Sequence, residues 1–125
     1  MRLATPFDPI EPGEFDYFAF DFTADVGTAT IVATSWSCEL SGFGTAGDPA
    51  PAQRIVSAAP QTEIALRSPL DGTLWTKSGF FSVALVGGMP LSASGGTYIL
   101  EATAMLSDGR TLKLNASVLC KAPGP

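Results

Sequence analysis

The fold is decided by residues Gly95–Cys120, GGTYILEATAMLSDGRTLKLNASVLC. Mostly apolar positions alternate with mostly polar ones on both sides of Asp108-Gly109: Tyr98, Leu100, Ala102, Ala104 and Leu106 before it, and Leu112, Leu114, Ala116, Val118 and Cys120 after it. Such alternation predicts two strands with one buried face. Asp-Gly favours a two-residue hairpin turn because both positions tolerate positive φ. Each arm could reach about 30 Å, so the hairpin either curls around a sandwich core or projects toward a partner.

Shorter strands are predicted upstream. We expect strands at Phe15–Phe22, Thr28–Cys38 and Phe80–Val86, and short edge strands at Arg54–Ala59 and Thr62–Leu66 interrupted by Pro60. Residues 41–53 are expected to form a long loop that is mobile or functional, residues 68–72 a turn, and residues 74–79 an irregular segment or a small hairpin.

Together these elements predict the fold class and the domain organisation. About seven strands without an amphipathic helix favour an all-β fold, a single antiparallel β-sandwich that is immunoglobulin-like. Prolines at every third position make residues 1–14 an extended arm, which docks either on its own domain or on a neighbour. The sandwich is expected to span residues 15–121, and residues 122–125 form a short tail.

Two cysteines and two tryptophans bear on this fold. Trp36 precedes Cys38 by two residues, so the cysteine–tryptophan signature of antibody domains is missing. The N-terminus has one arginine and no apolar segment, so we expect no signal peptide, and Cys38 and Cys120 are expected to be free, buried thiols. Trp36 alternates in phase with the core positions, whereas Trp75 lies among turn-forming residues and is a candidate for an exposed contact or a satellite core.

The composition favours a protein that contacts partner subunits. Only 15% of the residues are charged, and the net charge is −5. Residues 1–48 hold eight acids against one base, a net −7, and residues 49–125 hold four acids against six bases, a net +2. This asymmetry suits head-to-tail packing of identical subunits, and equally two independently solvated faces. The absence of a basic patch argues against nucleic-acid binding, and the absence of a long apolar run argues against a membrane helix.

The residue types also argue against an enzyme. The chain has no histidine, which general acid–base catalysis at neutral pH most often uses. Two cysteines alone make no zinc site, and neither Gly42-x-Gly44 nor Gly87-Gly88 has the context of a phosphate-binding loop. We therefore expect no catalytic residues, no metal and no cofactor.

Several short motifs occur in a recognisable order. They are the arm Asp8-Pro9-Ile10-Glu11-Pro12, the strand around Tyr17 and Asp21, the strand Thr28–Trp36, Gly95-Gly96-Thr97-Tyr98, and Ser107-Asp108-Gly109-Arg110. In this order they resemble the fiber–tail adaptor proteins of tailed bacteriophages. The resemblance covers both ends of the chain and leaves out residues 41–79, and the two cysteines depart from it.

The resemblance implies a function and a set of contact residues. It implies a structural virion protein, made in the host cytoplasm, that sits in a ring of copies on the phage tail. There it attaches tail fibers and contacts tail-tube or portal-proximal adaptor proteins. The arm and the terminal hairpin would then reach neighbours, for instance by adding a strand to a sheet edge. The partner-binding candidates lie on the arm, on the first strand and in the hairpin turn, and Trp75 is added to them as an exposed-contact candidate. They are Pro6, Phe7, Pro9, Ile10, Pro12, Phe15, Tyr17, Trp75, Asp108, Gly109 and Arg110.

A ligand-binding β-sandwich is the alternative. It depends on Trp75 and the long central loop, and its two forms are a carbohydrate-binding module and a capsid decoration protein. Both alternatives share the fold expected above.

Overall fold

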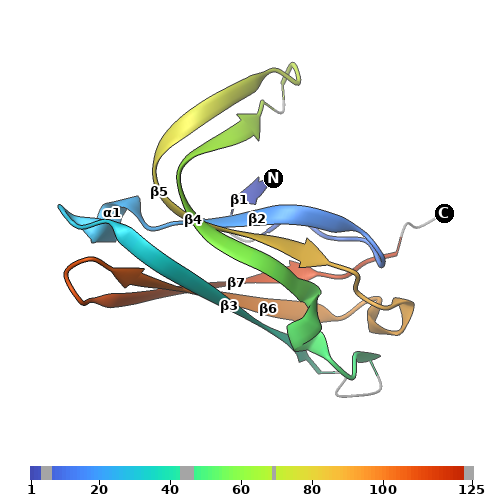
Figure 1. Cartoon of the computed structure of the whole chain (residues 1–125). Helices are drawn as coiled ribbons and strands as arrows, with labels where there is room; N and C mark the ends of the chain where they lie inside the picture. Colours follow the sequence, from blue (N-terminus) through green and yellow to red (C-terminus); the bar gives the residue numbers. More distant parts are fainter. Residues whose placement is uncertain (4–6, 43–46, 69, 123–125) are drawn as a thin grey trace.

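The computed structural model of the chain describes residues 1–3, 7–42, 47–68 and 70–122. Figure 1 shows two β-sheets that lie one above the other. One sheet has the order β1-β2-β5-β4 and the other the order β3-β6-β7. The elements are β1 (Arg2–Leu3), β2 (Phe15–Asp21), α1 (Thr23–Val26), β3 (Ile31–Ser41), η1 (Pro51–Arg54), β4 (Ile55–Arg67), β5 (Leu74–Gly87), η2 (Leu91–Ala93), β6 (Thr97–Leu106) and β7 (Thr111–Leu119). The predicted all-β class is confirmed.

The core lies between the two sheets and is rich in aromatic side chains. Phe18 and Phe20 of β2 enter it from one sheet, and Tyr98 and Leu100 of β6 from the other. Trp36 of β3 packs against this core, with its ring centroid 5.0 Å from that of Phe20. Its indole N–H donates to the hydroxyl of buried Ser82 over 2.7 Å, which satisfies both polar groups. Trp36 is therefore a core residue, as its periodicity predicts.

The terminal hairpin is one layer of the sandwich. β6 pairs with β7 from Thr97↔Leu119 to Met105↔Thr111, and its other edge pairs with β3. The buried positions of β6 alternate as predicted. The expected two-residue turn is wrong: the Gly109 N–H donates to the Leu106 carbonyl, and the Leu106 N–H donates to the Arg110 carbonyl. Ser107 thus joins Asp108 and Gly109 in a longer turn, and Gly109 takes φ 90°.

The element that leaves the sandwich is the β4–β5 hairpin, which curves away from the two layers in Figure 1. β4 runs unbroken from Ile55 to Arg67 and β5 from Leu74 to Gly87. The expected interruption at Pro60 is therefore wrong, and residues 74–79 form neither an irregular segment nor a small hairpin of their own. The predicted turn around residues 68–72 is confirmed by the Ser68 N–H, which donates to the Thr73 carbonyl.

Pro60 and Gly79 were expected to interrupt the strands of this hairpin, and the structure shows why they do not. β4 is the outermost strand of its sheet, as predicted, so the missing N–H of Pro60 costs no ladder hydrogen bond. The pairing shifts register next to it, between Gln61 and Glu63. Gly79 lies where β5 passes α1, because a Cβ there would stand 2.4 Å from the Thr23 hydroxyl. Both residues suit a continuous curved hairpin.

The curve of this hairpin covers part of the outer face of its sheet. Ile64 of β4 and Phe81 and Val83 of β5 form a second small core with Ala19 of β2. Leu3 of β1 and Leu66 of β4 pack against its rim. The four-stranded sheet is therefore buried on both faces near its middle, and the hairpin has its own anchoring contacts.

Candidate functional site

The N-terminal arm packs onto its own domain. β1 pairs in parallel with β2 through Arg2↔Phe18 and Leu3↔Ala19. Further along, Ile10 forms a parallel bridge with Cys120, and its N–H donates to the Leu119 carbonyl over 2.9 Å. The arm thus runs from the edge of one sheet to the edge of the other. Of the two alternatives for the arm, docking on its own body is the one the structure contains.

Burial changes the interpretation of two predicted contact residues. Phe7 sets its ring 4.8 Å from Phe18 and 5.3 Å from Phe20, in edge-on geometry, and Ile10 is completely buried. These two side chains belong to the protein's own core and leave no surface for a partner, so we correct the prediction for them. Pro9 is exposed and Pro12 half-buried. Pro6 lies outside the described residues.

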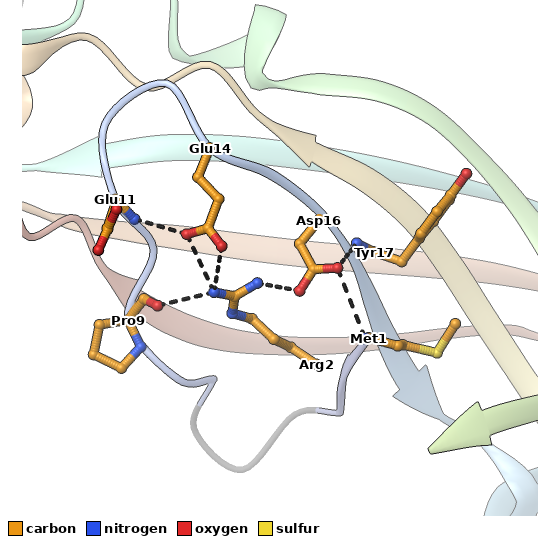
Figure 2. Close-up of polar contacts among 7 residues, drawn as sticks. All are labelled: Met1, Arg2, Pro9, Glu11, Glu14, Asp16 and Tyr17. Atoms are coloured by element: carbon orange, nitrogen blue, oxygen red, sulfur yellow. Dashed lines mark hydrogen bonds and ion pairs between the residues drawn. The ribbon is translucent and has the colours of Figure 1, made fainter. Parts of the chain in front are cut away.

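Arg2 fastens the arm, and Figure 2 shows the cluster around it. Its guanidinium pairs with the Asp16 carboxylate and reaches a Glu14 oxygen at 3.2 Å. It also donates to the Pro9 carbonyl over 3.1 Å and stands 5.3 Å from the centre of the Phe18 ring. The N-terminal amino group lies 3.7 Å from Asp16 as well. One cation therefore joins β1, the arm and β2, using several of its five donors.

The same cluster lowers the pKa of the Glu14 carboxyl group. The Glu11 backbone N–H donates to it over 3.0 Å, and this bond together with the Arg2 charge holds the pKa of Glu14 below its usual range. Partial burial acts in the opposite sense and is outweighed. The site thus stabilises an ionised carboxylate, which suits an ion-paired fastening and not a proton-transfer group.

Phe15 and Tyr17 are exposed on the outer face of the four-stranded sheet. Their side chains are 56% and 48% accessible, and their partners on β5 are Gly87 and Leu85. Because they project from the face opposite Phe18 and Phe20, they are open to a partner. Gly87 has no room for a side chain here, since a Cβ would lie 2.6 Å from the Phe15 Cα. Their contact role stays a prediction.

Three exposed apolar side chains lie at the end of the β4–β5 hairpin. Leu70 in its turn is 96% accessible, Leu74 66% and Trp75 48%. Trp75 is opposite Leu66 in the register, and of the two alternatives for its side chain, an exposed position or a satellite core, the structure shows the exposed one. At the base of the hairpin lies a cleft of about 430 Å³. It is lined by Thr30, Ile31, Pro60, Gln61, Thr62, Glu63 and Phe80.

The Asp108-Gly109-Arg110 turn makes contacts within the chain. Arg110 donates to the carbonyls of Asp25 and Val26 over 2.9 and 2.7 Å, and its Nε lies 2.8 Å from the Asp108 carboxylate. The last carbonyls of α1 are thereby capped by a cation, which also suits the helix dipole. The three residues remain exposed on the surface, and their role toward a partner stays a prediction.

Sequence reasoning missed a buried polar cluster at the start of β6. Asp48 is 2% accessible and accepts a hydrogen bond from the Tyr98 hydroxyl over 2.7 Å. Arg54 approaches the same carboxylate with its Nε at 3.3 Å. The Ala50 N–H donates to the other carboxylate oxygen over 3.0 Å. The cluster fastens the described part of the central loop to β6, and no local sequence pattern marks it.

Burial keeps the nearby phenol and thiols protonated. It raises the pKa of Tyr98 above its ordinary value of 10.0, and the hydrogen bond to Asp48 adds to the effect. Burial also raises the pKa of Cys38 from 9.0 to about 12 and that of Cys120 above 9.0. Both cysteines are buried free thiols, as expected. The cluster thus lacks the lowered pKa of a nucleophilic thiol.

Three further observations concern known types of site and protein. No group of three or more potential metal ligands lies together in the part of the chain that the structure describes. No helix in the described ranges is long and apolar enough to cross a membrane. Finally, no family model matches the chain, and none of the curated proteins searched matches it.

Proposed function

We propose that the protein is a structural adaptor on the tail of a tailed bacteriophage, where it attaches tail fibers through protein–protein contacts. The observation that carries the proposal is the projecting β4–β5 hairpin, whose end exposes Leu70, Leu74 and Trp75. Apolar side chains on a protruding element are typical of a contact surface. The resemblance of the arm and the Asp108-Gly109-Arg110 turn to fiber–tail adaptors supplies the phage context.

The motifs behind that resemblance fall on residues that build the fold. Ile10 of the arm closes the core, Trp36 crosses between the sheets, and Arg110 caps α1. A likeness in these residues therefore supports a shared architecture. The contact residues themselves would lie elsewhere, on the hairpin that the resemblance leaves out, and that hairpin could distinguish one adaptor's partners from another's.

We also infer that the sandwich is of the immunoglobulin type. The orders β1-β2-β5-β4 and β3-β6-β7 are those of the A-B-E-D and C-F-G sheets of constant-type domains. Trp36 lies on the strand equivalent to C, and Tyr98 lies near the start of the strand equivalent to F. Two features depart from the type: β1 is parallel to β2, and the Tyr98 hydroxyl bonds a carboxylate in place of backbone.

Immunolabelling tests the adaptor function. Antibodies against the purified full chain are applied to phage particles from a lysate of cells that carry the gene, and the particles are viewed by electron microscopy. We expect label at the junction of tail and fibers. Complementation with Leu74→Asp/Trp75→Ser should give particles without fibers, whereas the control Asp8→Ala should give normal particles. Fibered particles that lack the protein would overturn the proposal, and label confined to the head would favour a decoration protein.

A carbohydrate-binding module is the second candidate, and the accessible Trp75 is the observation in its favour. Trp36 takes no part in such a site because it is bonded to Ser82 inside the core. Binding of the full chain to a glycan array, lost in Trp75→Ala and kept in Trp75→Phe, would support this candidate. An array without binding would leave the adaptor as the better proposal.

A further inference from the structure

The outer edge of β4 is the longest edge that the structure leaves without a partner strand. β4 pairs with β5 on one side, and among the described residues no strand pairs with its other side. Nine of its thirteen residues are exposed, and the strand runs along the projecting hairpin in Figure 1. An exposed strand edge of this length is a template for pairing with another strand.

The backbone groups that face this edge follow from the hydrogen-bonding pattern of the hairpin. The Ser68 N–H donates to the Thr73 carbonyl over 2.8 Å, so residues 68 and 73 form a hydrogen-bonded pair. In an antiparallel ladder such pairs alternate with non-bonded ones. Ile64 and Leu66 therefore direct their N–H and C=O groups to β5. Glu63, Ala65 and Arg67 direct theirs to the open edge.

The charges along this edge are self-complementary. Glu63 and Arg67 are the two charged residues of β4, both are exposed, and they flank Ala65 symmetrically. Among the described residues Glu63 has no ion-pair partner. Arg67 gives one N–H to the Gly72 carbonyl over 2.6 Å and keeps its other donors. A second copy of the same strand, running antiparallel, presents the opposite charge at each position.

We propose that two copies of this chain pair β4 to β4, antiparallel, about a two-fold axis at Ala65. In this register Ala65 faces Ala65 of the partner, and Glu63 faces Arg67 of the partner at both ends. The residues that pair are those whose backbone N–H and C=O groups face the open edge, so each copy supplies the hydrogen-bond partners of the other. Ile64 and Leu66 come opposite one another on the other face of the sheet. The contact is isologous and closes as a dimer.

A charge-reversal series tests the pairing. The full chain is measured by sedimentation equilibrium from micromolar to submillimolar concentration. We expect a dimer whose dissociation constant rises roughly tenfold or more in Glu63→Arg, because this change sets two like-charge pairs across the axis. Arg67→Glu should weaken the dimer similarly, and the double variant Glu63→Arg/Arg67→Glu should restore it. A monomer at every concentration, or a double variant as weak as the single ones, would overturn the proposal.

Cross-linking tests the register independently of affinity. The Cα atoms of facing residues in a hydrogen-bonded pair are about 5.5 Å apart, within reach of a disulfide. Ala65→Cys should therefore form a cross-linked dimer under mild oxidation. The matched control is Thr76→Cys, which pairs with Ala65 within one chain but lies one strand further from the axis. Equal cross-linking of both variants would overturn the register, and the buried native thiols keep the background low.

The dimer does not depend on the proposed phage function. It uses the β4 edge, and it leaves the exposed side chains of Phe15 and Tyr17 for other partners. A dimer in solution with no label on phage particles would retain this inference and remove the adaptor proposal. Labelled tails with a monomeric chain would do the reverse.

Discussion

Asp48 shows how much one buried side chain contributes to this sandwich. A carboxylate that loses its water must be paired and hydrogen-bonded, and Asp48 has Arg54, Tyr98 and the Ala50 N–H. Its three partners come from the loop, from η1 and from β6. The carboxylate therefore holds in place the point at which the chain passes from the central loop into β4, the strand that leads to the projecting hairpin.

Replacing Asp48 by alanine is expected to lower the free energy of unfolding by about 3 kcal/mol or more, because Arg54 loses its counter-charge and the Tyr98 hydroxyl its acceptor. Urea unfolding followed by tryptophan fluorescence measures the change. Asp8→Ala, at an exposed carboxylate, is the control and should change stability by less than about 0.5 kcal/mol. Equal stability of the two variants would show that the cluster contributes nothing.

The two thiols give a second prediction at the scale of single residues. Cys38 and Cys120 are buried, and burial raises the pKa of both above 9.0. A disulfide reagent at pH 8 should label neither in the folded chain and both within seconds in concentrated urea, since the thiolate is the reactive form. The thiol of Asp8→Cys, at an exposed position, serves as the positive control. Rapid labelling of the native protein would mean that the region around the start of β6 opens readily.

At the scale of elements, the arm completes the sandwich. It joins the edge of β2 to the end of β7 and places Phe7 and Ile10 in the core. The spacing of these two residues carries a signal. An extended proline-rich segment has about three residues per turn, so positions 7 and 10 share a face. Pro9 and Pro12, which are also three residues apart, would share the next face along. This periodicity could have identified the arm as a core element.

Ile10→Ala is expected to lower the free energy of unfolding by about 2–5 kcal/mol, because it leaves a cavity in a fully buried site. The matched control is Leu70→Ala, which removes a similar side chain from the exposed hairpin turn and should cost less than about 0.5 kcal/mol. Thermal unfolding of both variants at low protein concentration measures the difference. A small effect of Ile10→Ala would indicate an arm that detaches from its domain in solution.

The elements differ in how far the sequence determines them. The alternation in residues 97–119 predicts β6 and β7 because each strand has one buried and one solvated face. The same reasoning failed for β4 and β5 because Pro60 and Gly79 break the pattern for tertiary reasons, an open edge and a close approach to Thr23. For Trp75 the turn-forming neighbours left an exposed position and a satellite core as alternatives, and the structure decides for the exposed one. The Arg2 and Asp48 clusters were not predictable, since their partners lie far away in the sequence.

At the scale of the whole molecule, the acidic first half of the chain is partly neutralised from within. Arg2 pairs with Glu14 and Asp16, Lys77 with Asp21, and Arg54 with Asp48. Two of these three bases come from residues 49–125, so folding pairs part of the excess acid of residues 1–48 with bases from the rest of the chain. The proposed pairing of Glu63 with Arg67 extends the same principle to a second copy.

This arrangement predicts acid instability of the whole sandwich. The pKa of Glu14 lies below its usual 4.5, mainly because the Glu11 N–H donates to its carboxylate and also because of Arg2. The pKa of Asp21 lies below its usual 3.8, because the hydrogen bonds from Thr23 and Lys77 outweigh the effect of burial. A lowered pKa means that the unfolded chain binds more protons, so this stabilisation is complete above the usual pKa values and is lost as pH falls from them through the lowered pKa values of the folded chain. The free energy of unfolding in urea should thus be flat from neutral pH to about pH 6 and decline below about pH 5. Glu14→Gln should make the decline shallower, and Glu11→Gln, which keeps the backbone donor, should not. An unchanged slope in Glu14→Gln would show that the Arg2 fastening does not couple this carboxylate to folding.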